Sequence, residues 1–307
     1  MGEPRHAAAL QPRPTSIALG IALTCFAFFC FSALDTTAKY LGQSLPVLQI
    51  VWFRFASHVV MAAILFRLWK RPYLIRTRRP VLQLLRGCFM LGATVFNFLA
   101  LRHLQLTEAN AIMFATPLTV VILAGPMLGE WAGRHRWAAV IVGFLGVLVV
   151  TRPGIGGMHW AAFLSAAAML CFALYTVTTR MLTATDTIEG LLLISAIVPT
   201  VVIAVPALAV WETPESPAIW FLLLLTGVSG GLGHWVLTKA YAVAPAPTLA
   251  PFSYTQIVWM TILGYLVFSD VPGVYTLVGM AIVVGSGLYV LYRERRRGPA
   301  RVADVRG

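Results

Sequence analysis

The segment IALGIALTCFAFFCFSALDTTAK, residues 17–39, determines the class of fold. Its charged residues are Asp35 and Lys39, both near its far end. A helix of about 20 apolar residues is long enough to cross the hydrocarbon core of a bilayer. No small-residue cleavage site follows the segment, as one would after a signal peptide. We therefore expect a retained membrane-spanning helix.

Nine further apolar segments of similar length follow, separated by short turns. The expected spans are 17–39, 47–69, 81–102, 108–128, 137–152, 159–180, 188–211, 218–239, 247–268 and 274–292. The 307 residues are 59% hydrophobic and 11% charged, which leaves too little polar surface to cover a soluble globule. Long continuous runs also differ from the short alternating segments of a membrane β-barrel. The sequence predicts an all-α integral membrane protein with ten transmembrane helices and no soluble catalytic domain.

The net charge of +12 does not indicate nucleic-acid binding, because the basic residues cluster in short segments between apolar runs. When the loops are assigned alternately to two sides, the side that holds both termini receives 19 of the 23 lysines and arginines. Basic residues are enriched on the cytoplasmic side of membrane proteins. We therefore expect a multi-pass protein of the inner (plasma) membrane with both termini in the cytoplasm.

A weak internal repeat divides the chain into halves. FSALDTTAK (31–39) resembles FALYTVTTR (172–180), and Glu130 pairs with Asp270 at a spacing of 140 residues. Each half holds five spans, so the second half enters the membrane upside down. We expect two inverted five-helix repeats, 16–153 and 158–292, between an N-terminal tail (1–15) and a basic C-terminal tail (293–307). Inverted repeats are typical of secondary transporters, whose substrate site lies near the midplane between the halves.

Two segments carry a family resemblance: PLTVVILAGPMLGE (117–130) and WAAVIVGFLGVLVVTRPG (137–154). With the two halves, they make the chain resemble the EamA-type transporters of the drug/metabolite transporter superfamily, over about residues 15 to 295. A finer resemblance is to the group of S-adenosylmethionine and riboflavin carriers. It is carried by DTTAKYLG (35–42), WFRF (52–55), LLRG (84–87) and APFSY (250–254). The resemblance implies a carrier of a small metabolite.

Arg54 is the most unusual residue, because it lies inside the second span and an intramembrane arginine is unfavourable unless paired or hydrated. It could face a central cavity and bind an anionic group such as a substrate carboxylate. It could equally form a fixed pair, for instance with Asp35. His58 lies four residues further on the same helix face, where it could line the cavity or simply be hydrogen-bonded.

Asp35 and Lys39 are also four residues apart on one helix face, so they could form an ion pair at the membrane boundary. The alternative is that Asp35 is the carboxylate that couples transport to protons. Glu130 and Asp270 lie at span ends, where we expect them to cap or anchor helices.

The ninth span is unusually polar, which indicates that it faces the interior of the bundle. Pro251 and Pro247 near its start, and Pro117 in the fourth span, would permit kinks. The expected substrate-binding residues are Arg54, His58, Asn97, Tyr175, Trp235, Ser253, Tyr254 and Gln256, with His234 beside them. Each of these could instead only pack helices together.

An enzyme is the alternative of another class. Gly227 to Gly231 fits the G-x-S-x-G pattern of a serine nucleophile, as in an intramembrane protease. The histidine that follows Ser229 is His234, on a different face of the same span, so close helix packing explains the glycines better. The four cysteines lack metal-ligand spacing, and the sequence has no HExxH motif or phosphate loop. We expect no metal or cofactor.

The sequence thus predicts an alternating-access carrier of a small polar or amphipathic metabolite, with import of a compound like S-adenosylmethionine or riboflavin as one possibility. An exporter of amino acids or drugs is the alternative. The expected partners are the metabolite and the lipid bilayer. Glycines in spans five and ten would permit close packing within one chain or between two, so a homodimer is possible; they are Gly143, Gly146, Gly279, Gly285 and Gly287.

Overall fold

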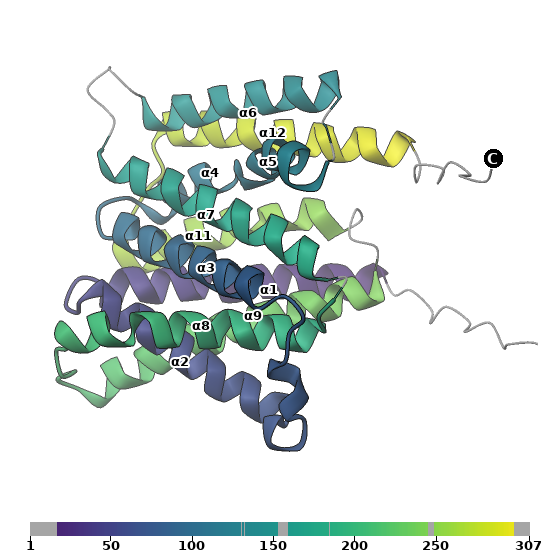
Figure 1. Ribbon diagram of the computed structural model, residues 1–307. Coiled ribbons are helices and arrows are strands. Elements are labelled where there is room, and N and C mark those ends of the chain that lie inside the picture. The colour runs from purple at the N-terminus through teal and green to yellow at the C-terminus, as the bar shows by residue number, and fades with distance from the viewer. Residues whose placement is uncertain are drawn as a thin grey trace, which may run out of the picture.

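The computed structural model describes residues 17–129, 131, 133–152, 159–183, 185–244 and 249–297, and all regular structure within them is helical (Figure 1). The first half contains α1 (Ile17–Leu41), α2 (Val47–Leu65), α3 (Pro80–Leu101), α4 (Leu106–Met113), α5 (Thr116–Leu128) and α6 (Arg134–Thr151). The second contains α7 (Ala161–Leu182), α8 (Ile188–Ala209), α9 (Pro217–Val243), α11 (Thr255–Phe268) and α12 (Val274–Arg297). Three short 3-10 helices are η1 (Leu68–Lys70), η2 (Pro72–Ile75) and η3 (Ala250–Tyr254). The expected N-terminal tail, Glu130, Pro247 and residues 298–307 lie outside the described ranges.

These helices supply the ten expected spans. Seven segments are long and apolar enough to cross a bilayer, with α4 and α5 counted together as Leu106–Leu128. Three shorter apolar helices complete the set: Trp137–Thr151, Phe252–Phe268 and Val274–Val290. We call the end of the bundle at the α1–α2 loop the outer end, and the end at the α2–α3 loop the inner end.

Two spans are broken at equivalent places in the two halves. The fourth span divides into α4 and α5 just before Pro117, and η3 with Pro251 precedes α11 in the ninth. Proline has no backbone N–H and its ring clashes with the preceding helical turn, so an uninterrupted α-helix is disfavoured there. The second span also ends earlier than expected, at Leu65, because Arg67 adopts a left-handed conformation with φ of 52°.

The halves interlock rather than lying apart. α1 packs on α9, and the corresponding pair α7 and α3 packs in the same way. The contact of α2 with α9 is likewise repeated by that of α8 with α3, while α6 packs on its own counterpart α12. In Figure 1, α6 and α12 lie at one side of the bundle and α2 at the other. Exchanging the halves therefore maps one set of helix contacts onto the other, as inverted repeats require.

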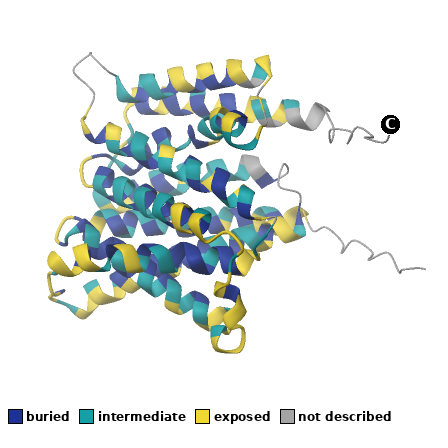
Figure 2. Cartoon of the chain, in the orientation of Figure 1, coloured by how far each residue is buried: buried dark blue, intermediate teal, exposed yellow. Residues whose placement is uncertain are grey.

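The distribution of side chains is that of a protein in lipid. Large apolar residues lie on the outside, for example on α6, as Figure 2 shows by the exposed positions along that helix. Examples are Val60, Ile141, Phe144, Val205 and Leu266. Strongly polar side chains lie inside the bundle instead, among them Gln49, Arg54, His58, Gln83 and Arg86. The polar groups that could act on a substrate are therefore gathered in the interior.

The glycines of the G-x-S-x-G pattern allow α2 to approach α9 closely. A Cβ atom at Gly227 would lie 2.6 Å from the Arg54 carbonyl oxygen, and one at Gly231 would meet His58 and Met61. Close contact between membrane helices commonly requires such small residues. The pattern is thus explained by helix packing. Gly146 and Gly279 bring α6 and α12 together in the same way, within one chain.

Candidate functional site

A polar cluster inside the bundle joins helices from both halves. Asp35 on α1 accepts a hydrogen bond from Asn97 Nδ2 on α3 at 3.1 Å. Arg54 on α2 interacts electrostatically with Asp35 and with Tyr175 on α7. Asp35 lies six residues before the end of α1 and Asn97 four residues before the end of α3, so the cluster lies in the outer half of the bundle.

Asp35 does not form the ion pair with Lys39 that the sequence spacing suggested. The Lys39 Nζ atom lies 2.6 Å from Asp270 Oδ2, in the loop after α11, and 4.6 Å from the centre of the Phe268 ring. The i to i+4 spacing allows a pair but does not choose between it and a partner on another helix. Asp270 therefore anchors α1, as its position at a span end suggested, and Asp35 is left to the interior with part of its surface accessible.

Arg54 is 4% exposed and lacks hydrogen-bond partners on two of its donor atoms. Within the described part of the chain, neither Nε nor Nη1 is paired. Its guanidinium lies 4.3 Å from the centre of the Phe55 ring, and a Cβ atom at Gly230 would lie 3.8 Å from its Nε and Nη2 atoms. The Asp35 carboxylate attracts the Arg54 charge without direct contact between the two side chains. The fixed ion pair between them is therefore not present among the described residues. A buried guanidinium with free donors is suited to bind an anionic ligand.

His58 lies one turn beyond Arg54 and faces another histidine. Its ring is nearly parallel to that of His234 on α9, with 6.4 Å between centroids and 10° between planes. The His234 ring in turn lies 4.9 Å from Phe31 on α1. The structure therefore brings Asp35, Arg54, His58, Asn97 and His234 to one region between α1, α2, α3 and α9.

Tyr175 marks the inner limit of the cluster, because it contacts a second buried arginine. Arg86 on α3 is 1% exposed, and its Nη2 donates to the Tyr175 hydroxyl at 3.2 Å. It also donates to Gln83, Thr179 and the Leu191 carbonyl oxygen, over distances of 2.7 to 3.2 Å. The count of 19 basic residues on the side of the termini included Arg86 as a surface charge, which is wrong. An arginine one and a half turns inside α3 was the signal that could have identified it.

The remaining expected residues lie elsewhere. Ser253 and Tyr254 belong to η3 and Gln256 to the start of α11; the Tyr254 ring packs 5.5 Å from Phe114 and its hydroxyl lies against Gly287. Trp235 lines a crevice between α2 and α9, apart from Asp35. Tyr254 and Trp235 thus contact residues outside the polar cluster, and the substrate-binding role of all four stays a prediction.

The comparisons with known proteins agree with this architecture. The sequence matches the EamA-like transporter family over residues 18–152 and again over 159–292. A solved crystal structure with 18% sequence identity has a TM-score of 0.63 and covers 92% of this chain and 99% of its own, which shows the same fold.

Curated relatives are named as carriers. An S-adenosylmethionine uptake transporter of Rickettsia bellii is 30% identical, over 91% of this chain and 95% of its own. A riboflavin transporter of Vibrio cholerae is 25% identical, over 87% and 91%. The pseudopaline exporter CntI of Pseudomonas aeruginosa is 29% identical, over 86% and 93%.

The fold and the interior polar cluster define a multi-pass membrane transporter built from two inverted five-helix repeats. The chain belongs to the EamA-like transporter family. The relatives are named as transporters of small metabolites and not as enzymes, so the protease alternative is set aside.

Proposed function

We propose that this transporter carries a small metabolite with an anionic group across the bacterial inner membrane by alternating access. The observation that supports the proposal is the buried Arg54, whose Nε and Nη1 atoms have no partner among the described residues. A substrate carboxylate that reaches the polar cluster would receive these two donors. Because the repeats 16–153 and 158–292 both contribute to the cluster, a relative movement of the halves would expose it first to one side and then to the other.

S-adenosylmethionine, or a compound of similar size and polarity, is our first choice of substrate, and import our first choice of direction. The support is that two rickettsial relatives, whose alignments span at least 86% of this chain, are named for S-adenosylmethionine uptake. The riboflavin transporter is a second possibility at lower identity.

The orientation belongs to the same proposal. Moving Arg86 from the inner loops into the bundle leaves 18 of the 23 lysines and arginines on the side of the termini. That asymmetry supports cytoplasmic termini. Gly146 and Gly279 are used for packing within one chain, so they give no support to a dimer interface. A homodimer therefore stays a prediction, which light scattering of the purified protein would test.

We assign Asp35 the coupling role. It keeps part of its surface accessible, and its described hydrogen bond comes from the amide of Asn97 rather than from a cation. A carboxyl group that is not held in an ion pair can take up and release a proton during the transport cycle. Asp35→Asn should therefore abolish protonophore-sensitive accumulation in cells while substrate exchange in vesicles continues. Loss of both activities would contradict a role limited to coupling.

The first test is uptake of labelled S-adenosylmethionine, riboflavin and amino acids by bacterial cells with and without the gene. Charge-assisted hydrogen bonds contribute about 1.5–3 kcal/mol, so Arg54→Gln should lower uptake of the preferred substrate, at concentrations below its KM, about 10- to 100-fold. Arg102→Gln, at the outer end of α3, is the matched control. Normal uptake by a monodisperse Arg54→Gln protein would refute the assignment.

Export is the second candidate, favoured by the similarity to the pseudopaline exporter. Cells that accumulate none of the compounds would be loaded with the same panel and followed for gene-dependent efflux. Efflux that depends on Arg54 would retain the site and reverse the direction.

A further inference from the structure

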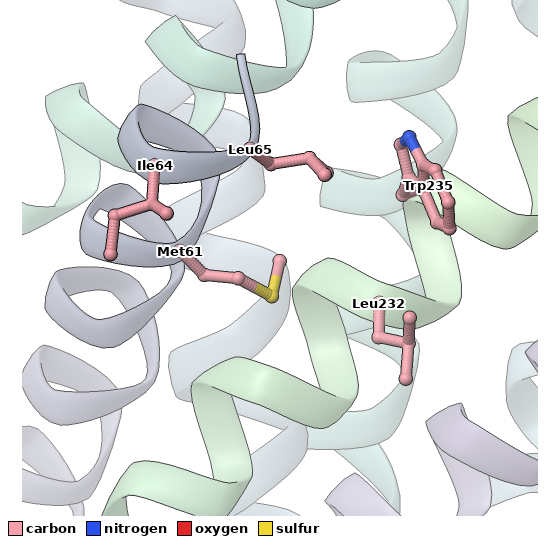
Figure 3. Close-up of a pocket in the computed structure, with 5 residues that line it drawn as sticks. All are labelled: Met61, Ile64, Leu65, Leu232 and Trp235. Carbon is pink, nitrogen blue, oxygen red and sulfur yellow. The ribbon is translucent and has the colours of Figure 1, made fainter. Parts of the chain in front are cut away.

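A crevice of about 250 Å³ lies between the inner parts of α2 and α9. Figure 3 shows its lining residues: Leu65 extends toward Trp235, and Met61 extends from α2 toward α9, above Leu232. The two helices are in close contact at Gly227, where Arg54 and Ser57 lie against the glycine. They diverge beyond Gly231, where the Met61 side chain fills the gap. Met61 lines the crevice and lies against Gly231 together with His58, so the crevice adjoins the inner side of the polar cluster.

The walls of the crevice are apolar and open to the outside of the bundle. The lining residues are Met61, Ile64, Leu65, Leu232 and Trp235. Of these, Ile64 is 61% and Leu65 is 43% exposed. Surfaces of this kind at membrane depth are covered by hydrocarbon. An opening that faces the bilayer laterally, between two membrane helices, is shaped for an acyl chain rather than for a water-soluble metabolite.

Positive charge lies at the inner end of the crevice. Lys239 follows Trp235 by one helical turn on α9, with its Nζ atom 5.6 Å from the centre of the indole ring. On the opposite wall, α2 ends at Leu65 and is followed by Arg67, Lys70 and Arg71. Basic pockets between membrane helices at the membrane surface bind the headgroups of anionic lipids.

We propose that this crevice is a binding site for an anionic phospholipid, whose acyl chain lies against Met61, Leu65 and Trp235 and whose phosphate contacts Lys239. The apolar walls account for the chain, and the lysine accounts for the charge. Trp235 is thereby assigned to lipid, in a membrane-facing site separate from the cluster around Arg54. The proposal does not depend on the identity of the substrate.

The test uses the full chain in phosphatidylcholine vesicles that contain brominated phosphatidylglycerol or, in parallel, brominated phosphatidylcholine. Bromine atoms on the acyl chain quench nearby indoles. The difference between the wild-type protein and Trp235→Phe isolates the quenching of Trp235 from that of the other tryptophans. One basic residue near the membrane surface adds about fivefold to the affinity for an anionic lipid. We expect half-maximal quenching of Trp235 at an about fivefold lower fraction of phosphatidylglycerol than of phosphatidylcholine.

Two variants distinguish the site from general attraction to basic protein. Lys239 is exposed, and Lys239→Gln should make both lipids reach half-maximal quenching of Trp235 at the same fraction. Arg134→Gln removes an exposed charge at the inner end of α6, on the opposite side of the bundle from α2, and should leave the fivefold preference unchanged (Figure 1). Equal quenching by both lipids in the wild type would overturn the proposal. An equal effect of the two variants would do so as well.

Leu65→Phe tests the acyl-chain half of the proposal, because a larger side chain at the end of α2 fills the crevice. Quenching of Trp235 should then require more of either lipid. If Leu65→Phe instead impairs transport and leaves lipid quenching intact, the crevice belongs to the substrate pathway and the lipid site is refuted.

Discussion

The ion pair of Lys39 with Asp270 joins the end of α1, in the first half, to the loop after α11, in the second. Alternating access requires the halves to separate at one end at a time, so a bond between them at the outer end should favour the conformation closed at that end. The perturbation is Asp270→Asn, which removes one charge with little change of shape.

The burial of the pair sets the size of the effect. The side chains of Lys39 and Asp270 are 12% and 21% exposed, which is intermediate between a surface pair and a fully buried one. Surface pairs contribute about 0–1 kcal/mol, whereas removing one partner of a buried pair costs about 3–5 kcal/mol. Lys39 also keeps its contact with the Phe268 ring after the substitution, which offsets part of the loss. We therefore expect Asp270→Asn to destabilise the conformation closed at the outer end by about 1–2 kcal/mol. This corresponds to a roughly 5- to 30-fold shift of the equilibrium toward the outward-open conformation.

The assay is the labelling rate of a single cysteine in the outer cavity beside the ion pair. Leu101 is 1% exposed and lines an outer cavity of about 490 Å³ together with Lys39 and Arg102. Leu101→Cys, with the four native cysteines replaced, should react with a membrane-impermeant maleimide 5- to 30-fold faster when Asp270→Asn is added. Exchanging the charges with Lys39→Asp and Asp270→Lys should restore slow labelling.

Glu215→Gln is the matched control, because it removes an exposed acidic charge from another outer loop. An unchanged rate in Asp270→Asn would refute the argument that this pair closes the outer end. An equal acceleration in Glu215→Gln would show that the effect comes from net charge rather than from the bond.

Three further predictions concern stability in detergent. Gly227→Ala, which forces α2 away from α9, should lower the free energy of unfolding by about 1–3 kcal/mol. Gly285→Ala, where a Cβ atom has no neighbour within 4 Å, should leave it unchanged. Equal midpoints of thermal unfolding for the two variants would contradict this. Arg86→Met removes four hydrogen bonds of about 0.6 kcal/mol each and should lower it by about 2 kcal/mol, measured by thermal unfolding. Burial tends to raise the pKa of Asp186 in the α7–α8 loop, but hydrogen bonds and the charge of Arg86 outweigh it and hold the pKa below its ordinary value. The ionised Asp186 carboxylate therefore stabilises the folded protein above the ordinary pKa of about 3.9, and this contribution is lost as the pH falls through the lower folded-state pKa. Asp186→Asn should make the free energy of unfolding fall less steeply as the pH is lowered.

The number and order of the spans could be predicted because a bilayer imposes a length of about 20 apolar residues on every helix. The inversion of the halves followed from an odd number of spans in each. The breaks in the fourth and ninth spans were also signalled, by Pro117 and Pro251. These features depend on local sequence and on the solvent, and both are visible in a single chain.

The partners of the charged residues could not be predicted in the same way. The spacing of Asp35 and Lys39 suggested a pair within one helix, yet each side chain contacts a residue more than 60 positions away. Arg86 was taken for a surface charge because hydropathy treats a charge near a span end as a loop residue. Partners between helices depend on which faces meet, and the sequence of one chain carries no direct record of that.

The inverted repeat gives the outer ion pair a counterpart at the inner end. Lys39 aligns with Arg180 in the last turn of α7, and Asp270 aligns with Glu130, which follows α5 in the sequence and lies outside the described residues. α5 packs against α7, as α11 packs against α1. An operation that exchanges the halves also exchanges the ends, so the repeat predicts that a substitution at position 130 acts on the inner end as one at Asp270 acts on the outer end. Glu130→Gln should then slow the labelling of the cysteine at position 101, the reverse of Asp270→Asn, and a change in the same direction would show that the two positions do not act as alternates.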